Sequence, residues 1–409
     1  MSSTAPGKVV SAPTPPGITP RLTAVLAVAC GAIISNIYYA QPLVAPISRS
    51  LHMPVRLSGL VVTLSQLGFG AGLLLVVPLA DLLENRRLVI VMLAVTCLGL
   101  AGVALSGSTD TFLLAAFVVG LGSIAAQVLV PLAAHLAPDD QRGRVIGNVM
   151  GGLIGGIMLA RPLASLLAAS FGWRTVFEVS CVGMMVLAVV LRRVLPVRDP
   201  GLDHQDHRPR YGQLLASMLR MLRLRTLQRR IAYQMLAFAA FNLFWTAIPL
   251  MLAERFGLTQ RGIALFALAG AGGTLAAPLA GRLADRGLTR QLTLMVPVMM
   301  AACFLTTRWA AGAGSLLVLV AASVILDGCV QINQVTSQRV IYALQPQARG
   351  RINGIYMAMM FVGGACGSSL GTVTEADGGW ALTALAGAGL GLLAFALVLT
   401  ERASVPRRP

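Results

Sequence analysis

Long apolar runs alternate along the chain with short polar connections, and the runs have the length of membrane-spanning helices. Such a helix needs about 20 mostly apolar residues to cross the hydrocarbon core of a bilayer, and tilt accommodates longer runs. The pattern predicts twelve spans: 22–47, 57–80, 88–106, 110–135, 144–170, 173–194, 231–253, 260–281, 291–309, 313–341, 350–373 and 380–400. Gly, Ala and Ser recur within the runs, so we expect the helices to pack closely.

The second half of the chain repeats the pattern of the first. The tripeptide Arg-Gly-Arg occurs at 142–144 and again at 349–351, an offset of 349 − 142 = 207 residues, about half of the chain. Further pairs at this offset are Gln127 with Gln334, Trp173 with Trp380, and Pro42 with Pro249. Two similar bundles can rock about a site that lies between them, so the repeat indicates a membrane transporter.

The spans divide the chain into two bundles and a linker. We expect an all-α membrane protein with twelve transmembrane helices in two pseudo-symmetric six-helix bundles. The predicted divisions are a disordered tail at 1–20, a bundle at 21–194, a linker at 195–230, a bundle at 231–401 and a tail at 402–409. Within the linker, Leu214 and Met218 alternate with arginines at helical spacing, which predicts an amphipathic helix on the anionic inner leaflet. The linker is either a tether or a regulatory lipid sensor.

The charges indicate the orientation of the chain. Lysine and arginine number 32 against 15 acids, but the basic residues cluster in alternate connections. This clustering and the mean hydropathy of +0.77 fit a membrane protein and argue against a nucleic-acid partner. Basic connections stay in the cytoplasm, so both termini are predicted to be cytoplasmic. Outside the linker, the arginines in the connections predicted to be cytoplasmic are Arg86, Arg87, Arg142, Arg144, Arg282, Arg286, Arg290, Arg349 and Arg351.

Three motifs carry a family resemblance. A loop motif, Gly-x-x-x-Asp followed by basic residues, begins at Gly281 and contains Asp285 and Arg286. Two further segments read Asn-Ile-Tyr-Tyr-Ala-Gln-Pro at 36–42 and Arg-Gly-Arg-Ile-Asn-Gly-Ile-Tyr-Met at 349–357. Together with the twelve spans, these motifs resemble the major facilitator superfamily. Within it, the chain is similar to bacterial twelve-helix drug or sugar efflux permeases.

The chain departs from that family pattern at three positions. Val77 stands where the first-half loop motif has glycine. Ala116, four residues before Gly120, stands where drug–proton antiporters carry an arginine. In the fifth span, Arg161 precedes Pro162 where the antiporter motif has glycine. The last two departures weaken the expectation of drug antiport by the usual route.

Two ionisable residues lie deep in predicted spans, where a charge is costly and marks a functional site. Asp327 lies near the middle of the tenth span, and Arg161 lies well inside the fifth. Burial disfavours a charged carboxylate and a nearby arginine favours it, so separating the two groups would promote proton uptake. We hypothesise that Arg161 and Asp327 approach each other across the halves and couple protonation to rocking. The alternative is a permanent buried ion pair that fixes the bundles.

A polar stripe accompanies Asp327, because glutamines four, seven and eleven residues after it share its helical face. An unpaired amide that faces lipid is costly, so this face should line a cavity. The resemblance implies that the first, fourth, seventh and tenth spans surround that cavity. The predicted cavity residues are Asn36, Tyr39, Gln127, Asn242, Trp245, Gln331 and Gln334. Each amide could instead bond between helices, and Trp245 could be packed in the core.

Charged groups at the cytoplasmic helix ends form a second set of candidates. The resemblance implies that such groups lock the inner gate through charge pairs and helix dipoles. The predicted gating residues are Asp81, Arg86, Arg142, Gly281, Asp285, Arg286 and Arg349. The alternative is a role in topology alone, which accounts for the arginines but not for the aspartates.

These observations favour a proton-coupled secondary transporter that exports a small organic molecule by alternating access. The expected partners are that substrate, protons and the lipid bilayer, and the protein is expected to act as a monomer in a bacterial inner membrane. The sequence has no nucleotide-binding loop, metal-ligand cluster or nucleophile–base arrangement, so we expect no cofactor and no enzymatic activity. Two alternatives stay open: uptake by symport or facilitated diffusion, and a membrane sensor that transports nothing.

Overall fold

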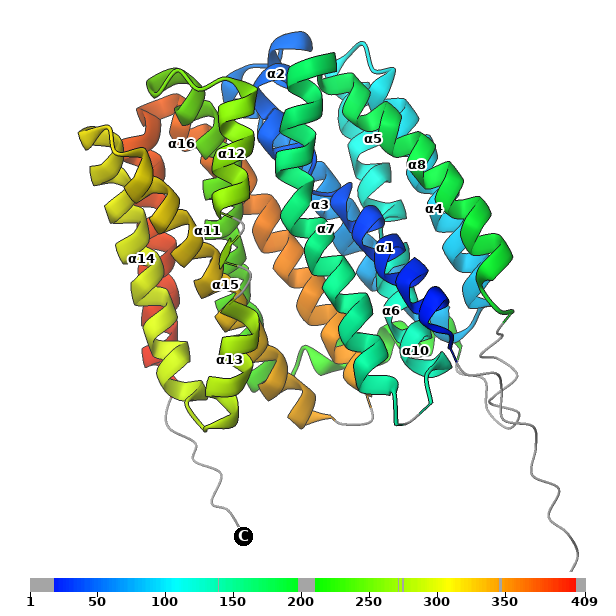
Figure 1. The fold of residues 1–409 in the computed structure, drawn as a ribbon. Helices are drawn as coiled ribbons and strands as arrows, with labels where there is room; N and C mark the ends of the chain where they lie inside the picture. The colour runs from blue at the N-terminus through cyan, green and yellow to red at the C-terminus, as the bar shows by residue number, and fades with distance from the viewer. Residues whose placement is uncertain are drawn as a thin grey trace, which may run out of the picture.

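The computed structural model describes residues 18–138, 140–197, 210–270, 272–273, 276–345 and 348–401, except for the side chains of Ala277, Pro278 and Asp285. Within these ranges the chain is helical and has no strand (Figure 1). The predicted tail at 402–409, most of the tail at 1–20 and the linker segment 198–209 lie outside the described residues.

Both halves contain long helices together with short ones. The first half contains α1 (Pro20–Ser35), η1 (Gln41–Leu43), α2 (Val44–Ser50), η2 (Val55–Leu57), α3 (Leu60–Leu75), η3 (Val77–Asp81), α4 (Asn85–Ala104), α5 (Thr109–Gly122), α6 (Ala125–Leu136), α7 (Arg142–Phe171) and α8 (Trp173–Val194). The remainder contains α10 (Tyr211–Met221), α11 (Arg225–Arg255), α12 (Gln260–Gly270), α13 (Ala276–Asp285), α14 (Thr289–Ala313), α15 (Leu316–Leu344) and α16 (Arg349–Leu399). The elements labelled η are short 3-10 helices.

All twelve predicted spans fall on these helices, but some spans are divided between two helices and two spans share one helix. In the described part of the chain, nine helical stretches are long and apolar enough to cross a bilayer. The first span is divided after Ser35, and the eighth is divided into α12 and α13. The last two spans form α16, which is broken at Gly378 and Gly379; the latter has a φ of 59°, a conformation open to glycine. The all-α fold is confirmed, and the number twelve stays a prediction.

The break in the first span brings polar groups to the middle of the molecule. α1 ends at Ser35, and Pro42 occupies the first turn of η1. Proline has no backbone N–H with which to continue a helix. The turn buries Tyr38 and Gln41, which are 4% and 0% exposed. Irregular backbone at this depth is tolerated because protein surrounds it.

The two halves meet along two seams. In the first seam, α3 packs against α16, from Gly59 beside Thr372 to Leu73 beside Gly354. In the second seam, α7 packs against α12, whereas α13 packs chiefly against α15. We call the end of the molecule at which α10 lies the inner end, and the end at which α2 lies the outer end (Figure 1).

The linker helix α10 packs on the protein. Its apolar residues Leu214, Met218 and Met221 are buried, and the helix contacts both η3 and α16. The hydroxyl of Tyr211 donates a hydrogen bond of 2.7 Å to the carbonyl oxygen of Leu75. An amphipathic helix is therefore present, but the expectation that this apolar face lies on the lipid leaflet is wrong, because it contacts both halves instead.

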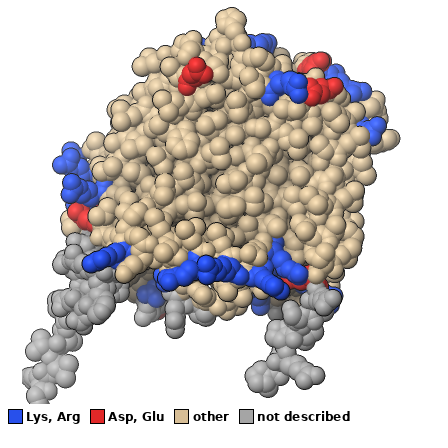
Figure 2. Space-filling view, turned by 180° about the vertical axis from the view of Figure 1, so that it is seen from behind, with Lys and Arg blue, Asp and Glu red and all other residues tan. Residues whose placement is uncertain are grey.

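Basic side chains gather at the inner end. Figure 2 shows a band of them along this end and a largely uncharged surface over the middle of the molecule. An uncharged middle is required where helices cross the hydrocarbon core. The distribution agrees with the predicted orientation, and the assignment of the inner end to the cytoplasm stays a prediction.

Candidate functional site

Two buried charges lie where the halves meet. Arg161 of α7 is 3% exposed, and Asp327 of α15 is 2% exposed. Because they belong to opposite halves, movement of one half against the other changes their separation. A charge is tolerated in a dry interior only where neighbouring groups compensate it, so the surroundings of each residue decide what the pair can do.

Aromatic rings and one amide surround the guanidinium of Arg161. Its Nε donates a hydrogen bond of 2.7 Å to Oε1 of Gln41. Its Cζ lies 4.5 Å from the centre of the Trp245 ring, 5.1 Å from that of Phe241 and 5.2 Å from that of Tyr38. Attraction between a cation and ring faces is strongest where both are desolvated. Nη2 is buried and has no hydrogen-bond partner in the described part of the chain.

Trp245 connects the two charges. Its Nε1 donates a hydrogen bond of 2.8 Å to Oδ1 of Asp327, while the face of the same indole contacts Arg161. Within the described ranges, Arg161 and Asp327 make no direct ion pair. The two charges thus approach each other across the halves with a neutral ring between them. The permanent ion pair expected as the alternative is not formed.

A chain of buried amides ties the halves together beside this contact. Oδ1 of Asn242 accepts hydrogen bonds from Nε2 of Gln41, at 2.8 Å, and from Nε2 of Gln66. Its Nδ2 donates to the carbonyl oxygen of Phe238 at 2.9 Å. Gln66 of α3 was not among the predicted site residues, because a single amide in the apolar run 57–80 forms no stripe. The three amides are each 0% exposed, so they hold the halves together in a dry interface.

The other predicted cavity residues have different contacts. Asn36 accepts a hydrogen bond of 2.6 Å from the hydroxyl of Ser180, a contact within the first half. Gln334 contacts the sulfur of Met357 at 3.8 Å. The remaining three, each partly buried, are Tyr39, Gln127 and Gln331. The structure therefore connects Asn242, through Gln41, and Trp245 to the charged pair. The role of all seven residues in substrate binding stays a prediction.

The site is closed toward the outer end. Beside Arg161 and Trp245, the space that a water-sized molecule can occupy is about 10 Å³, enough for about one water. Further out, Nη2 of Arg56 on η2 lies 3.2 Å from Oδ2 of Asp377 on α16, an ion pair between the halves. This pair was not foreseen, because an acid and a base far apart in sequence give no local signal.

The predicted gating residues lie at the inner end of the molecule. Nε of Arg142 donates a hydrogen bond of 3.0 Å to the carbonyl oxygen of Ala134. Asp81, Arg286 and Arg349 are exposed, and Arg86 is partly exposed. A side chain added at Gly281 would meet no atom within 4 Å. The side chain of Asp285 lies outside the described residues, so its predicted part in the gate stays a prediction.

The sequence matches a known family over most of its length. The family model described as Major Facilitator Superfamily covers residues 24–338 and 233–409. The chain belongs to this superfamily. It is 40% identical to the uncharacterized transporter YgaY of Escherichia coli O157:H7, over 92% of this chain and 94% of that protein. It is 31% identical to the probable transporter SCO4007 of Streptomyces coelicolor, over 92% of this chain and 87% of that protein.

A weaker relative carries a more specific name. The chain is 26% identical to the probable sugar efflux transporter of Mannheimia succiniciproducens, over 42% of this chain and 44% of that protein. The resemblance inferred from the loop motifs is confirmed at the level of the superfamily. This protein is a multi-pass membrane transporter of the major facilitator type.

Solved transporters share the fold. The nucleoside transporter NupG has a TM-score of 0.73 at 13% identity, covering 93% of this chain and 100% of that one. A POT family transporter in complex with 5-aminolevulinic acid has a TM-score of 0.71 at 13% identity, with coverages of 93% and 95%. The human organic anion transporter MFSD10 has a TM-score of 0.63 at 18% identity, with coverages of 93% and 100%. At these identities the likeness concerns the fold alone.

Proposed function

We propose that this major facilitator protein exports a small organic molecule in exchange for protons, and that Asp327 is the group that binds the proton. The observation that carries the proposal is the buried contact of Asp327 with Trp245 and, through its ring, with Arg161. An ionisable group at this depth in a membrane protein has few purposes other than ion or substrate handling.

Protonation of Asp327 changes the contact between the halves in two ways. The hydrogen bond from Trp245 loses its charged acceptor, and charge-assisted hydrogen bonds are roughly twice as strong as neutral ones. Arg161 loses its opposing charge and keeps only its amide and ring contacts. A proton shifts a conformational equilibrium only if it binds one state better than another. Protonated Asp327 therefore favours the state in which Arg161 has moved away from Trp245.

The chemistry around Arg161 supports a substrate with an apolar body and few hydrogen-bonding groups. The rings of Tyr38, Phe241 and Trp245 offer flat apolar surface, and Nη2 of Arg161 is a donor without a partner in the described part of the chain. Ligand sites commonly combine such surface with a few convergent polar groups. The name of the Mannheimia relative, a sugar efflux transporter, supports export. We place the protein, as a monomer, in a bacterial inner membrane with both termini in the cytoplasm.

The test is proton movement in liposomes that contain the protein and an internal pH dye. Antimicrobials, sugars and organic acids are added in turn, and a substrate is identified by a proton flux that protein-free liposomes lack. Asp327→Asn should abolish this flux while the thermal unfolding midpoint stays close to that of the wild type, because the amide still accepts the hydrogen bond from Trp245.

The matched control is Glu178→Gln, which removes an exposed acid of the spanning helix α8. It should leave the flux unchanged. Proton flux that persists in Asp327→Asn would overturn the assignment of the proton site. Substrate flux without any proton movement in the wild type would overturn proton coupling and leave facilitated diffusion.

A further inference from the structure

A cavity of about 400 Å³ lies at the inner end of the second half, away from the charged pair at the seam. It is formed where the first turns of α11 and α14 meet the end of α16, at the edge of the molecule (Figure 1). Its wall includes Arg230, Thr289, Arg290, Thr293 and Glu401. None of these residues takes part in the proposed transport step.

Arg230 is buried in this wall, and its hydrogen bonding is incomplete. Its side chain is only 7% exposed. Nη1 donates a hydrogen bond of 3.0 Å to the hydroxyl of Thr293, and Nη2 lies 3.7 Å from Oε1 of Glu401, which is beyond hydrogen-bond range. Nε is buried without a partner among the described residues. A buried guanidinium with spare donors is suited to an oxyanion, which can accept two of its N–H groups at once.

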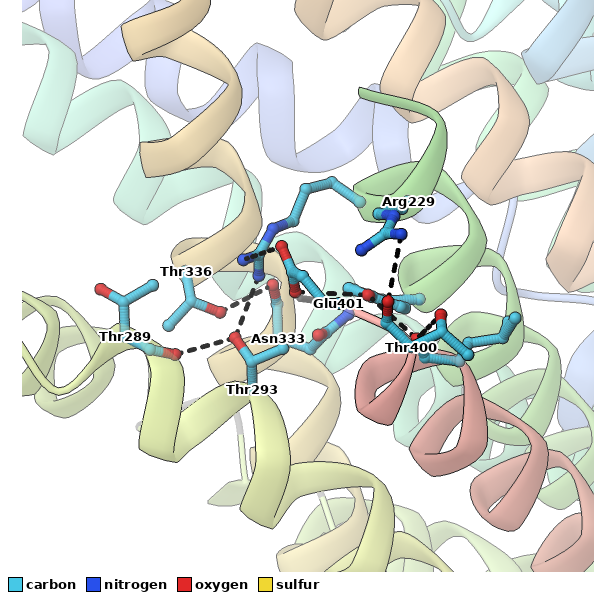
Figure 3. Close-up of polar contacts among 10 residues, drawn as sticks. Arg229, Thr289, Thr293, Asn333, Thr336, Thr400 and Glu401 are labelled. Carbon is cyan, nitrogen blue, oxygen red and sulfur yellow. Dashed lines mark hydrogen bonds and ion pairs between the residues drawn. The ribbon is translucent and has the colours of Figure 1, made fainter. Parts of the chain in front are cut away.

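The start of α14 supplies further donors. Leu288 precedes the helix and provides no side-chain cap, so the first-turn N–H groups lack helical partners. The hydroxyl of Thr293 donates to the carbonyl oxygen of Thr289 at 2.8 Å, which leaves its lone pairs for Arg230. In Figure 3, Thr289 and Thr293 lie on one side of Glu401, and Thr400 and Arg229 lie on the other. The partial positive charge of a helix N-terminus attracts anions.

The charges that line the cavity do not balance. Arg230 and the exposed Arg290 face a single described acid, Glu401. That acid also accepts a hydrogen bond of 3.3 Å from the hydroxyl of Tyr233. Beside the cavity, Arg229 donates to the carbonyl oxygen of Thr400 at 3.2 Å. An anion larger than a carboxylate would reach both Arg290 and the start of α14.

The remaining wall is apolar, and part of it is exposed at the surface of the protein. It contains Leu294, Val398 and Leu399, and the last of these is 62% exposed. Met295, which follows Leu294 in α14, is 45% exposed. Such a surface suits an acyl chain. Basic pockets between membrane helices at the cytoplasmic side commonly hold phospholipid head groups.

We propose that this cavity is a binding site for a phosphate-bearing anion, held by Arg230, Arg290 and the first turn of α14, with Glu401 as an internal competitor. The phosphate is supplied by an anionic phospholipid or by a soluble phosphate compound. A ligand that binds only the folded protein raises its stability with concentration, so thermal unfolding measures the affinity.

The experiment uses the full chain, purified in a neutral detergent. The unfolding midpoint is titrated with short-chain phosphatidylglycerol, with uncharged diacylglycerol of the same chain length, with glycerol phosphate and with inorganic phosphate. Phosphatidylglycerol should raise the midpoint in a saturable way, and diacylglycerol should not. Stabilisation by phosphatidylglycerol alone identifies a lipid head group. Equal stabilisation by glycerol phosphate or inorganic phosphate identifies a soluble source.

Three substitutions test the ligands. Arg290→Gln, on an exposed side chain, should weaken phosphatidylglycerol binding about tenfold, because it removes a charged donor. Glu401→Gln should strengthen binding, an effect that a purely structural role for Glu401 would not produce. Arg308→Gln, at the opposite end of α14, is the control and should bind like the wild type. Unchanged affinity in Arg290→Gln, or stabilisation by diacylglycerol equal to that by phosphatidylglycerol, would overturn the site.

Discussion

The two seams between the halves differ in how far along their length they are closed. In the seam of α3 with α16, Thr63 donates a hydrogen bond of 2.9 Å to the carbonyl oxygen of Ala365, and the rings of Phe69 and Phe361 lie 4.6 Å apart. In the seam of α7 with α12, the inner part of α7 is open. A side chain added at Gly143, Gly147, Gly151 or Gly155 would meet no atom within 4 Å.

From this difference we infer that the two seams behave differently when the halves rock. A seam that is packed and hydrogen-bonded along its length keeps the halves together while they turn. A seam with an open inner face has room to close there as its outer part opens. Arg161 belongs to α7, so the charged contact lies on the seam that changes. Packed interfaces switch between discrete arrangements rather than deforming continuously, which suits two alternating states.

The largest expected effect on stability comes from Gly59→Leu, which inserts a bulky side chain into the closed seam. A side chain at this position would begin 2.5 Å from the carbonyl oxygen of Ser368. Overpacking against backbone costs about 1–3 kcal/mol or more. We therefore expect a clearly lower thermal unfolding midpoint and less folded protein in detergent. A midpoint equal to that of the wild type would show that this seam is not tightly held.

A second substitution, Gly147→Leu, places the same side chain on the inner part of α7, where Gly147 lines a cavity with Pro20 and Thr23. No atom lies within 4 Å of its starting point, so the unfolding midpoint should stay unchanged. Transport should nevertheless fall about tenfold, because the added bulk disfavours closure of the inner end. Gly183→Leu, on the equally open outer face of α8, is the control and should transport like the wild type. Equal transport by both variants would contradict closure against this face of α7.

The smallest effect is expected for Arg56→Gln, which removes the ion pair with Asp377 at the outer end. The two side chains are 63% and 42% exposed, and exposed pairs contribute about 0–1 kcal/mol. The unfolding midpoint should fall slightly at low salt, and this difference from the wild type should vanish at high salt because salt screens exposed charges. A large, salt-independent loss would mean that the outer end is held mainly by this pair.

The sequence predicted the helices well because run length and composition decide which segments cross a bilayer. It also predicted that Asp327 lies inside the protein, because a charge that faces lipid is costly. It did not predict that the indole of Trp245 stands between the two charges. That arrangement depends on how two helices, 82 residues apart at these positions, are turned toward each other. The same reason explains why Gln66 was missed, since its partner Asn242 lies in the other half.

The internal repeat does not extend to the charged residues. Its offset places Ser368 opposite Arg161, since 161 + 207 = 368, and Gly120 opposite Asp327, since 327 − 207 = 120. Two identical halves that cross the membrane in the same direction would present the same groups to each other across the axis between them. Here one half holds the cation and the other holds the acid, with no copy of either. The two halves are therefore not interchangeable at this contact, because the cation always comes from α7 of the first half and the acid from α15 of the second.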